Sequence, residues 1–292
     1  MALDLPSSLS PSKVASFTEC ALAFRFSAID RLPDPPTVAT VRGTLVHSAL
    51  ERLLLLDVPD RTPDGARQCL HDARAELATD PEAIALGLDA EGEAAMAAEA
   101  ERLLERYFEL EDPKAIRPIG LELKLEVDVD GLRLRGIIDR LELDDDGELI
   151  VTDYKSGRSP GPHFEQSRLN GVHFYAFLCE RVLGRRPAAV QLMYLGDGVT
   201  IRTEPTDQSL RALERKVRAI WSAIEKACER DDFRPRTSRL CDYCAYQAFC
   251  PAFGGDPEDA RREAARLAAV AAAQLLDVTD GAAEAVPLAS PV

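Results

Sequence analysis

Apolar residues recur every three or four positions through most of residues 1–112, which is the spacing of helices that bury one face. The stretch "LSPSKVASFTECALAFRFSAI" at 9–29 has Ser10 at a cap position and Pro11 at the first helical position. It therefore predicts one helix, and Cys20 lies inside it.

A proline-rich connector, "LPDPPTVA", separates this helix from "RGTLVHSALERLLLL" at 42–56, where the helical spacing resumes. Residues four positions apart share a helix face, so Gly43, His47 and Glu51 are expected on one side of this second helix. Residues 61–110 predict further helices, the last of them amphipathic. The first part of the chain is thus predicted to be mainly helical.

Near residue 119 the helical spacing gives way to two-residue alternation, which is typical of strands. "GLELKLEVDVDGLRLRGIIDRLEL" predicts two strands with a turn at Asp130-Gly131, and "ELIVTDYKS" predicts a third. A helix is expected over 164–183, two more strands within 187–205, and a long helix over 208–230. The core is therefore predicted to be a mixed α/β structure.

These elements suggest a single domain over residues 1–270. Its expected parts are a mainly helical portion, a sheet core and a cysteine-bearing segment, over residues 1–112, 113–235 and 236–255. From 271 the composition offers no clear face to bury, so residues 271–292 are expected to form a disordered tail.

The turn "DDDG" sets how the second and third strands pair. If residues 145–147 form a three-residue loop with Gly147 in the left-handed conformation, Asp144 lies opposite Glu148. Leu143 then faces Leu149, and Leu141 faces Val151, which groups the leucines. A two-residue Asp-Gly turn would shift the register by one and split this set between the two faces.

The same three-residue loop places Asp139 opposite Asp153, with Lys155 two residues further along on the same side. Opposed carboxylates repel each other unless a cation lies between them, so the register favours a divalent-cation site. The simpler interpretation is that D-x-K is a common tripeptide pattern and that Asp139 pairs with Arg140 or Lys155 on a solvated face. The apolar surroundings argue against that interpretation.

The formal net charge of the 292 residues is -15, from 50 acidic and 35 basic residues, which argues against indiscriminate binding to polyanions. A local basic patch is still expected beside the acids, where Arg140, Arg158 and Arg168 gather. The sequence has neither a leader-like segment nor an apolar run long enough to span a bilayer, so a cytoplasmic protein without membrane contact is expected.

Seven cysteines are an odd number in a chain of this kind, so metal binding is a better use for a cysteine cluster than disulfides. Cys241, Cys244 and Cys250 form a C-x2-C-x5-C array, and Cys20 is a distant fourth thiol. Four thiolates suit zinc as well as an iron–sulfur cluster. The remaining cysteines are expected in the core: Cys69, Cys179 and Cys228.

The strand motifs resemble those of the PD-(D/E)XK nuclease superfamily, specifically RecB-family exonucleases, which carry an acid on one strand and D-x-K on the next. "GIIDR" and "TDYKSG" match these motifs, and "GTLVHSALE" is similar to the family's upstream G-x3-H-x3-E helix. The resemblance implies a restriction-endonuclease-like α/β core with a central mixed sheet flanked by helices. It implies that Mg²⁺ or Mn²⁺ is bound by His47, Asp139, Asp153 and the main-chain carbonyl of Tyr154.

The resemblance also implies a catalytic role for Lys155. Glu122 matches an acid often found on the first strand of these sheets, with a less clear role. A further family motif is Q-x3-Y on the helix after D-x-K, where Tyr175 fits but Gly171 replaces the glutamine. The catalytic set implied by the family is His47, Asp139, Asp153, Lys155 and Tyr175.

The cysteine spacing is similar to the iron–sulfur staple of AddB-type and CRISPR-associated RecB-like nucleases. This similarity implies that a 4Fe-4S cluster is bound by Cys20, Cys241, Cys244 and Cys250, with zinc as the alternative occupant, and that 236–255 is an iron–sulfur segment.

The resulting hypothesis is a metal-dependent DNA exonuclease of repair or recombination, acting on single-stranded or open-ended DNA, with a helicase as a possible partner. Arg140, Arg158 and Arg168 beside the site would then contact DNA phosphates. The alternatives are a CRISPR-adaptation nuclease, which shares these motifs, and a structural DNA-binding subunit with weak catalysis. Gly171 and the acidic net charge motivate the last alternative.

Overall fold

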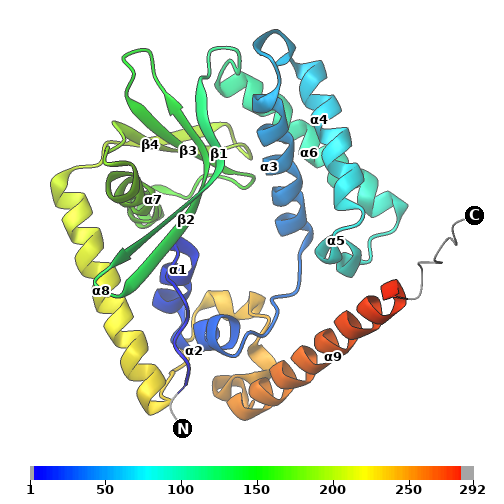
Figure 1. Cartoon of the computed structure of the whole chain (residues 1–292), viewed down its shortest axis with the longest axis vertical. Helices are drawn as coiled ribbons and strands as arrows, with labels where there is room; N and C mark the ends of the chain where they lie inside the picture. The colour runs from blue at the N-terminus through cyan, green and yellow to red at the C-terminus, as the bar shows by residue number, and fades with distance from the viewer. Residues whose placement is uncertain (1–2, 284–292) are drawn as a thin grey trace, which may run out of the picture. The chain divides into compact units, whose positions relative to one another are not determined.

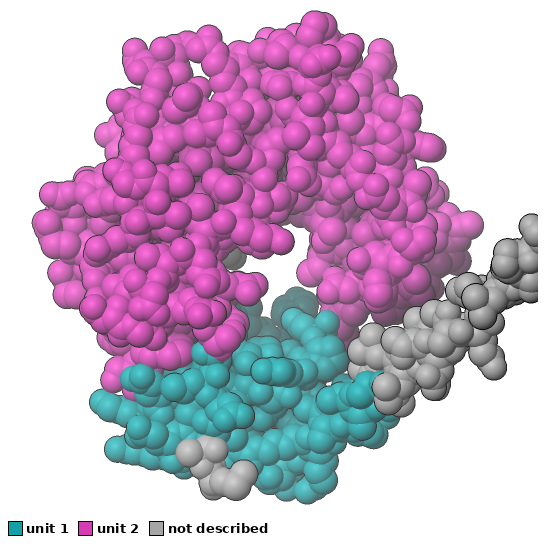
Figure 2. Space-filling model, in the orientation of Figure 1, with its two compact units in different colours: residues 1–6, 16–34, 224–292 teal, residues 7–15, 35–223 magenta. Residues whose placement is uncertain are grey.

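The computed structural model describes residues 3–283, except for the side chains of residues 162–170, 271 and 273–283. The chain divides into two compact units (Figure 2). Unit 1 comprises residues 1–6, 16–34 and 224–292, and unit 2 comprises residues 7–15 and 35–223. The expected helical portion and sheet core lie mostly in unit 2, whereas the cysteine-bearing segment lies in unit 1.

Unit 2 is built on a mixed sheet that, within residues 3–283, has five strands in the order β1-β2-β3-β4-β5 (Figure 1). The strands are β1 Pro118–Val129, β2 Leu132–Leu143, β3 Leu149–Lys155, β4 Ala189–Tyr194 and β5 Val199–Thr203. Neighbouring strands are antiparallel except β3 and β4, which are parallel and are joined through helix α7, Pro162–Leu183. A parallel pair needs such a crossover because a tight turn reverses the chain direction and can join only antiparallel strands.

Two turns fix the registers around the acidic residues. Between β1 and β2, Asp130 and Gly131 both have positive φ, 54° and 83°, as a two-residue hairpin turn with the twist of a β-ribbon requires. Between β2 and β3, Gly147 has φ 75° and the Asp144 N–H donates to the Glu148 carbonyl oxygen (3.0 Å). The predicted three-residue loop is confirmed.

The pairing that this loop predicts is also confirmed, with Leu143 opposite Leu149 and Leu141 opposite Val151. The ladder ends at Arg140 and Thr152. The next residue on each strand is an acid of the predicted site, so the carboxylates lie where the two strands stop exchanging backbone hydrogen bonds.

Helices cover the sheet, with α3, α4 and α6 packed together on one side and α7 on the other (Figure 1). These helices are α3 Val38–Leu55, α4 Pro63–Leu77 and α6 Ala90–Leu110, with α5 Pro81–Leu86 between the last two. Their buried apolar faces form one cluster that also includes Tyr154, Met193 and Leu195 of the sheet side. The α/β core with a mixed sheet flanked by helices is therefore confirmed.

The first predicted helix is interrupted at Cys20. Helix α1 spans Pro11–Glu19, and Cys20 itself has extended dihedrals, φ -156° and ψ 110°, as the N-cap of α2, Ala21–Phe24. A π-helical turn, η1 Arg25–Ile29, follows directly. The placement of Cys20 inside a continuous helix was wrong, because this residue leaves helical geometry and its thiol lies at a helix start.

Unit 1 continues after α8, Asp207–Arg230, with three short 3-10 turns and a long final helix. The turns are η3 Arg239–Tyr243, η4 Gln247–Phe249 and η5 Pro251–Phe253, and the helix is α9 Pro257–Ala283. Residues 271–283 of the expected disordered tail are thus helical. Their alanine-rich composition favours a helix even without an obvious face to bury. Residues 284–292 lie outside the described residues.

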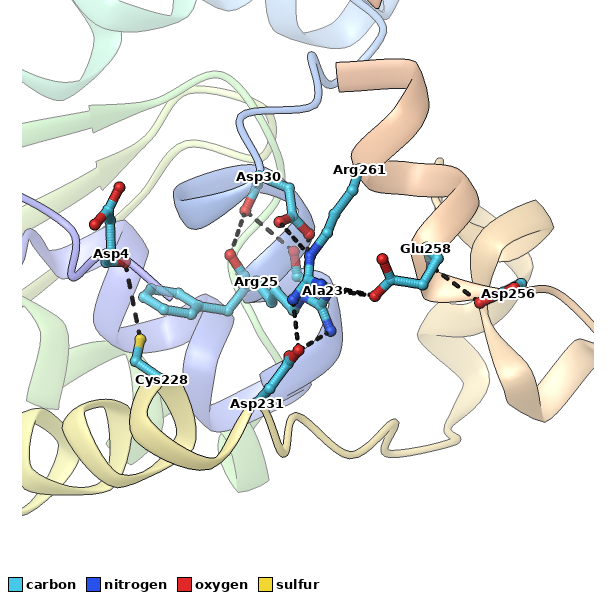
Figure 3. A network of polar contacts seen from close by, with 11 residues as sticks. Asp4, Ala23, Arg25, Asp30, Cys228, Asp231, Asp256, Glu258 and Arg261 are labelled. Carbon is cyan, nitrogen blue, oxygen red and sulfur yellow. Dashed lines mark hydrogen bonds and ion pairs between the residues drawn. The ribbon is translucent and has the colours of Figure 1, made fainter. Parts of the chain in front are cut away.

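A buried ionic network joins three segments of unit 1 (Figure 3). Arg25 of η1 pairs with Asp30 and Asp231, each at 3.1 Å, and Arg261 of α9 pairs with Asp231 at 2.6 Å and Glu258 at 2.7 Å. Burial raises the pKa of Asp30 although the neighbouring arginines oppose this effect. The network ties the first turn of α9 to the segment that follows Cys20.

Within residues 3–283, none of the helices combines the length and the apolar character needed to cross a membrane.

Candidate active site

His47 reaches the site from α3. The helix begins at a capping box between Thr37 and Thr40, and it buries its apolar side against α4 and α6. The opposite side carries Gly43, where an added Cβ would lie in ordinary contact, 3.4 Å, with the Ser156 hydroxyl oxygen just after β3. Helix α3 thus passes the end of β3 one turn before His47.

Two carboxylates meet the His47 ring. Its Nδ1 lies 3.7 Å from Glu122 Oε1 and 3.6 Å from Asp139 Oδ2, and Nε2 donates a hydrogen bond to the Tyr154 carbonyl oxygen (3.1 Å). His47, Glu122 and Asp139 offer ligand atoms that all lie within 4.8 Å of one another. This group has the residue types and the spacing of a cation site.

Glu122 is held there by an unusual backbone. Its φ is 44°, in the left-handed region that a residue with a Cβ rarely adopts, in the middle of strand β1. The residues on either side keep a regular register, with Leu121 opposite Arg140 and Leu123 opposite Ile138. Glu122 therefore lies opposite Asp139, and the local distortion accompanies the approach of its carboxylate to His47.

Asp139 lies at the end of the β2–β3 ladder. Its Oδ2 accepts a hydrogen bond from the Tyr154 N–H (2.7 Å), which replaces the backbone bonding that the diverging strands no longer supply. Burial and the charge of Asp153 raise the pKa of Asp139 to about 7, although His47 and the Tyr154 N–H act in the opposite direction. Without a further cation, both carboxylates are hard to ionise together.

The charge of His47 responds to the same surroundings. Burial alone would lower the pKa of the imidazole, but Glu122, Asp139 and Asp153 raise it above its usual value. The acids thus stabilise the doubly protonated ring, and burial opposes it. A divalent cation would compete with that proton because a metal-binding imidazole must be neutral.

Asp153 and Lys155 end β3 beside this group. Their side chains form an ion pair, with Asp153 almost fully buried and Lys155 partly exposed. Burial opposes the charge on Lys155, yet Asp153 keeps the pKa of the ammonium above its usual value. Lys155 is therefore a protonated, positioned cation at the mouth of the site.

Tyr175 on α7 makes a side-chain hydrogen bond with Asp153. Burial, together with the charges of Asp153 and Asp139, raises the pKa of its phenol. Gly136 of β2 makes room for it, since a Cβ there would come within 3.2 Å of the Tyr175 ring and 2.8 Å of Leu178. At Gly171, four residues earlier, an added Cβ would meet nothing within 4 Å.

The predicted site residues therefore fall into two touching groups. The first is His47 and Asp139, joined by Glu122, with ligand atoms within 4.8 Å of one another. The second is Asp153, Lys155 and Tyr175 around β3. Two of the expected ligands, His47 and the Tyr154 carbonyl, are hydrogen-bonded to each other.

A groove of about 670 Å³ opens from this site along α3. Its walls include hydroxyl groups of Thr40, Thr44 and Ser156, and its acidic end is formed by Glu51 and Glu122. Small hydroxyl side chains suit close approach of a sugar-phosphate strand.

The three arginines expected to contact DNA have different surroundings. Arg158 is exposed in the loop after β3. Arg168 lies on α7 among the side chains outside the described residues. The prediction that Arg140 contacts DNA was wrong, because its side chain is 0% exposed and its guanidinium is held by Glu111 and Glu142 inside the fold.

In unit 1, the four predicted thiols line one small cavity: Cys20, Cys241, Cys244 and Cys250. Backbone N–H groups donate to two of them, from Arg236 to Cys20 Sγ (3.5 Å) and from Ser238 to Cys241 Sγ (3.4 Å).

The other cysteines, Cys69, Cys179 and Cys228, are buried as expected. Cys20 and Cys250, which are 230 positions apart in the sequence, both line this cysteine site.

The sequence contained a signal for Glu122 that was not used. A two-residue turn at Asp130-Gly131 pairs Val129 with Leu132, and counting back along both strands puts Glu122 opposite Asp139. The positive φ of Glu122 could not be foreseen, since nothing in the surrounding residues calls for it.

These features define an α/β protein with a group of acidic side chains and a histidine that could bind a cation. The group lies where two strands diverge, next to a lysine. The chain matches the PD-(D/E)XK nuclease superfamily over residues 8–251, more than half of its length. It belongs to that superfamily. Hydrolytic nuclease chemistry on nucleic acid is therefore the activity that its family indicates.

Individual proteins show how far the likeness extends. The Gene 69 protein of Mycobacterium phage L5 is 30% identical over 147 residues, covering 50% of this chain and 47% of the phage protein, so the match spans about half of that relative. The crystal structure of a "Putative exonuclease" from Eubacterium rectale superposes with a TM-score of 0.52 at 14% identity, over 82% of this chain and 87% of that one. That likeness concerns the fold.

Proposed function

We propose that the protein is a divalent-metal-dependent DNA exonuclease of the RecB type, acting on single-stranded or open-ended DNA. The observation that carries the proposal is the convergence of His47, Glu122 and Asp139 within 4.8 Å, directly beside the Asp153–Lys155 pair. Superfamily membership and the fold of the Eubacterium rectale protein support the reaction class.

The residues fit a hard divalent cation. Carboxylate oxygens are the preferred ligands of Mg²⁺ and Mn²⁺, and the raised pKa of Asp139 reports negative charge that lacks a counter-ion. His47, Glu122, Asp139, Asp153 and the Tyr154 carbonyl would hold it. When bound, such an ion polarises a phosphate and makes an attacking water more acidic.

The remaining chemistry belongs to the chain itself. The Lys155 ammonium, held by Asp153, would stabilise the negative charge that builds on the phosphate during hydrolysis. Tyr175 would keep Asp153 oriented. Arg158 and the groove along α3 would hold the DNA strand, so that binding weakens as salt is raised.

The cysteine site is proposed to carry a 4Fe-4S cluster with a structural role. The four thiols line one cavity, and four thiolates suit zinc as well as such a cluster. The family resemblance favours the cluster.

The test uses purified, cluster-loaded protein with labelled DNA, linear or circular and single- or double-stranded, in Mg²⁺ or Mn²⁺. We expect release of nucleotides from linear substrates, and a loss of about 100-fold or more in Asp153→Ala and Lys155→Ala. Asp145→Ala, in the exposed turn between β2 and β3, is the matched control and should keep full activity.

Activity that persists in both site variants would refute the proposed site. Binding of DNA with no cleavage under any condition would instead favour the structural DNA-binding subunit. Activity that appears only with an added helicase would point to a partner enzyme.

A further inference from the structure

We infer that Arg140, anchored by Glu111, is a positioning residue that sets the geometry of the cation site through the side chain of Tyr154. The inference rests on the proposed function, and it assigns a role to an arginine that lies too deep to touch DNA. Arg140 and Tyr154 each follow an acid of the site, Asp139 and Asp153, so their side chains point to the opposite side of the strands.

Both terminal nitrogens of the Arg140 guanidinium are held by hydrogen bonds. They bind both carboxylate oxygens of Glu111, the C-cap residue of α6, with Nη2 at 2.9 Å from Oε2. The same group donates to Glu142 (3.1 Å), the Thr152 hydroxyl (3.1 Å) and the Tyr154 hydroxyl (2.7 Å). A two-pronged contact of this kind fixes the orientation of the group as well as its position.

Tyr154 connects the fixed Arg140 guanidinium to the residues of the site. Its ring lies edge-on to the His47 ring, 6.2 Å between centroids, and Arg140 lies over its face at 5.5 Å. Its carbonyl oxygen accepts the hydrogen bond from His47, and its N–H donates to Asp139 (2.7 Å). Three of the groups expected to bind the cation are therefore in contact with, or part of, the residue whose hydroxyl Arg140 holds.

Stability alone is a weak reason for this arrangement. Burying one cation between two carboxylates requires removing water from all three, and apolar side chains of similar size commonly serve as well or better in a core. Orientation is what such a network does supply. Residues that orient the direct ligands of a metal typically change its affinity by about 10- to 100-fold when altered.

The test is Mn²⁺ binding by the full-length, cluster-loaded protein, measured by calorimetry and by the Mn²⁺ electron paramagnetic resonance spectrum. Two conservative variants remove contacts of Arg140, one to the Tyr154 hydroxyl and one to Glu111. Tyr154→Phe deletes one oxygen and keeps the ring and the carbonyl, and Glu111→Gln keeps the shape of the anchor. We expect each to raise the Kd for Mn²⁺ about tenfold or more and to alter the spectrum.

Arg61→Lys is the matched control for a buried arginine without a link to the site. Arg61 is 8% exposed and donates to the carbonyl oxygens of Leu56 (3.0 Å), Ile116 (2.9 Å) and Pro113 (3.2 Å). Its replacement should lower thermal stability while leaving the Kd for Mn²⁺ within twofold.

Unchanged Mn²⁺ affinity in both Tyr154→Phe and Glu111→Gln would overturn the inference and leave the proposed function standing. An equal loss of affinity in Arg61→Lys would also overturn it, because the effect would then come from general destabilisation. If the unaltered protein bound no Mn²⁺, the proposed function would fail first, and the inference with it.

Discussion

Replacing Asp139 by asparagine should make the metal-free protein more stable at alkaline pH. The pKa of this carboxyl rises from 3.8 to about 7 in the fold, mainly through burial and the charge of Asp153. The folded protein therefore retains a proton that the unfolded chain releases, and stability from this group falls as pH rises from about 4 to about 7. Above that range the loss is complete.

The size of the effect follows from the shift. At about 1.4 kcal/mol per pKa unit, the shift corresponds to roughly 4 kcal/mol as an upper limit. Asparagine keeps an oxygen that can accept the Tyr154 N–H, but it removes one of the charges that favour protonated His47. The net gain should be about 1–2 kcal/mol, or a rise in Tm of about 2–8 °C for a domain of this size.

The assay is thermal unfolding in EDTA at pH 5 and pH 8, repeated with excess Mn²⁺. At pH 5 Asp139→Asn should unfold only slightly later than the unaltered protein, because the loss that begins near pH 4 has then covered about one of its three pH units. At pH 8 the loss is complete and the difference should be larger. Saturating Mn²⁺ should reverse the order, since binding at 100 times the Kd stabilises the unaltered protein by about 2.7 kcal/mol. Asp145→Asn in the exposed turn should behave as the unaltered protein throughout.

The same difference between Asp139→Asn and the unaltered protein at both pH values would refute the reasoning. So would a lower Tm for Asp139→Asn in EDTA at pH 8, because the buried negative charge would then not be a source of instability.

Two further predictions concern the cysteine site and α7. Cys20→Ser should lose the visible absorbance of the cluster and much of the soluble protein, whereas Cys69→Ser, in the buried helical core, should keep the absorbance; retained absorbance in Cys20→Ser would remove this thiol from the site. Gly171→Gln restores the family's Q-x3-Y pattern ahead of Tyr175, at a position where an added Cβ meets nothing within 4 Å. The change should stabilise α7 by about 0.5–1 kcal/mol and should also lower the Kd for DNA. Gly171→Ala should give the stability without the tighter binding, and equal DNA affinity in the two variants would show that the glutamine position has no role here.

Register explains why much of the site could be predicted from the sequence. The DDDG turn and the grouped leucines allow one consistent pairing of β2 with β3, and the acids then follow by counting. The same counting across the turn at Asp130-Gly131 also predicts Glu122 opposite Asp139. A hairpin with a known turn thus predicts facing residues on both strands as far as the pairing remains regular.

Contacts between distant segments were the part that could not be predicted. The charge of Arg140 and its place beside Asp139 suggested a DNA contact, and the alternation of the strand already placed it on the opposite face. Whether that face is open or covered depends on α6, whose C-cap residue Glu111 lies 29 positions earlier. Nothing in the local pattern specifies that helix as the cover.

The backbone of Glu122 shows why regular patterns fail at the site itself. Alternation along β1 predicts extended geometry throughout, and a φ of 44° opposes the intrinsic preference of a residue with a Cβ by about 1 kcal/mol or more. The strained Glu122 belongs to the same small group as Asp139, whose carboxyl has a raised pKa beside a second carboxylate. Both features are unfavourable for the metal-free fold. A single divalent cation would relieve the electrostatic repulsion, and the strained backbone would hold the Glu122 carboxylate in place as a ligand.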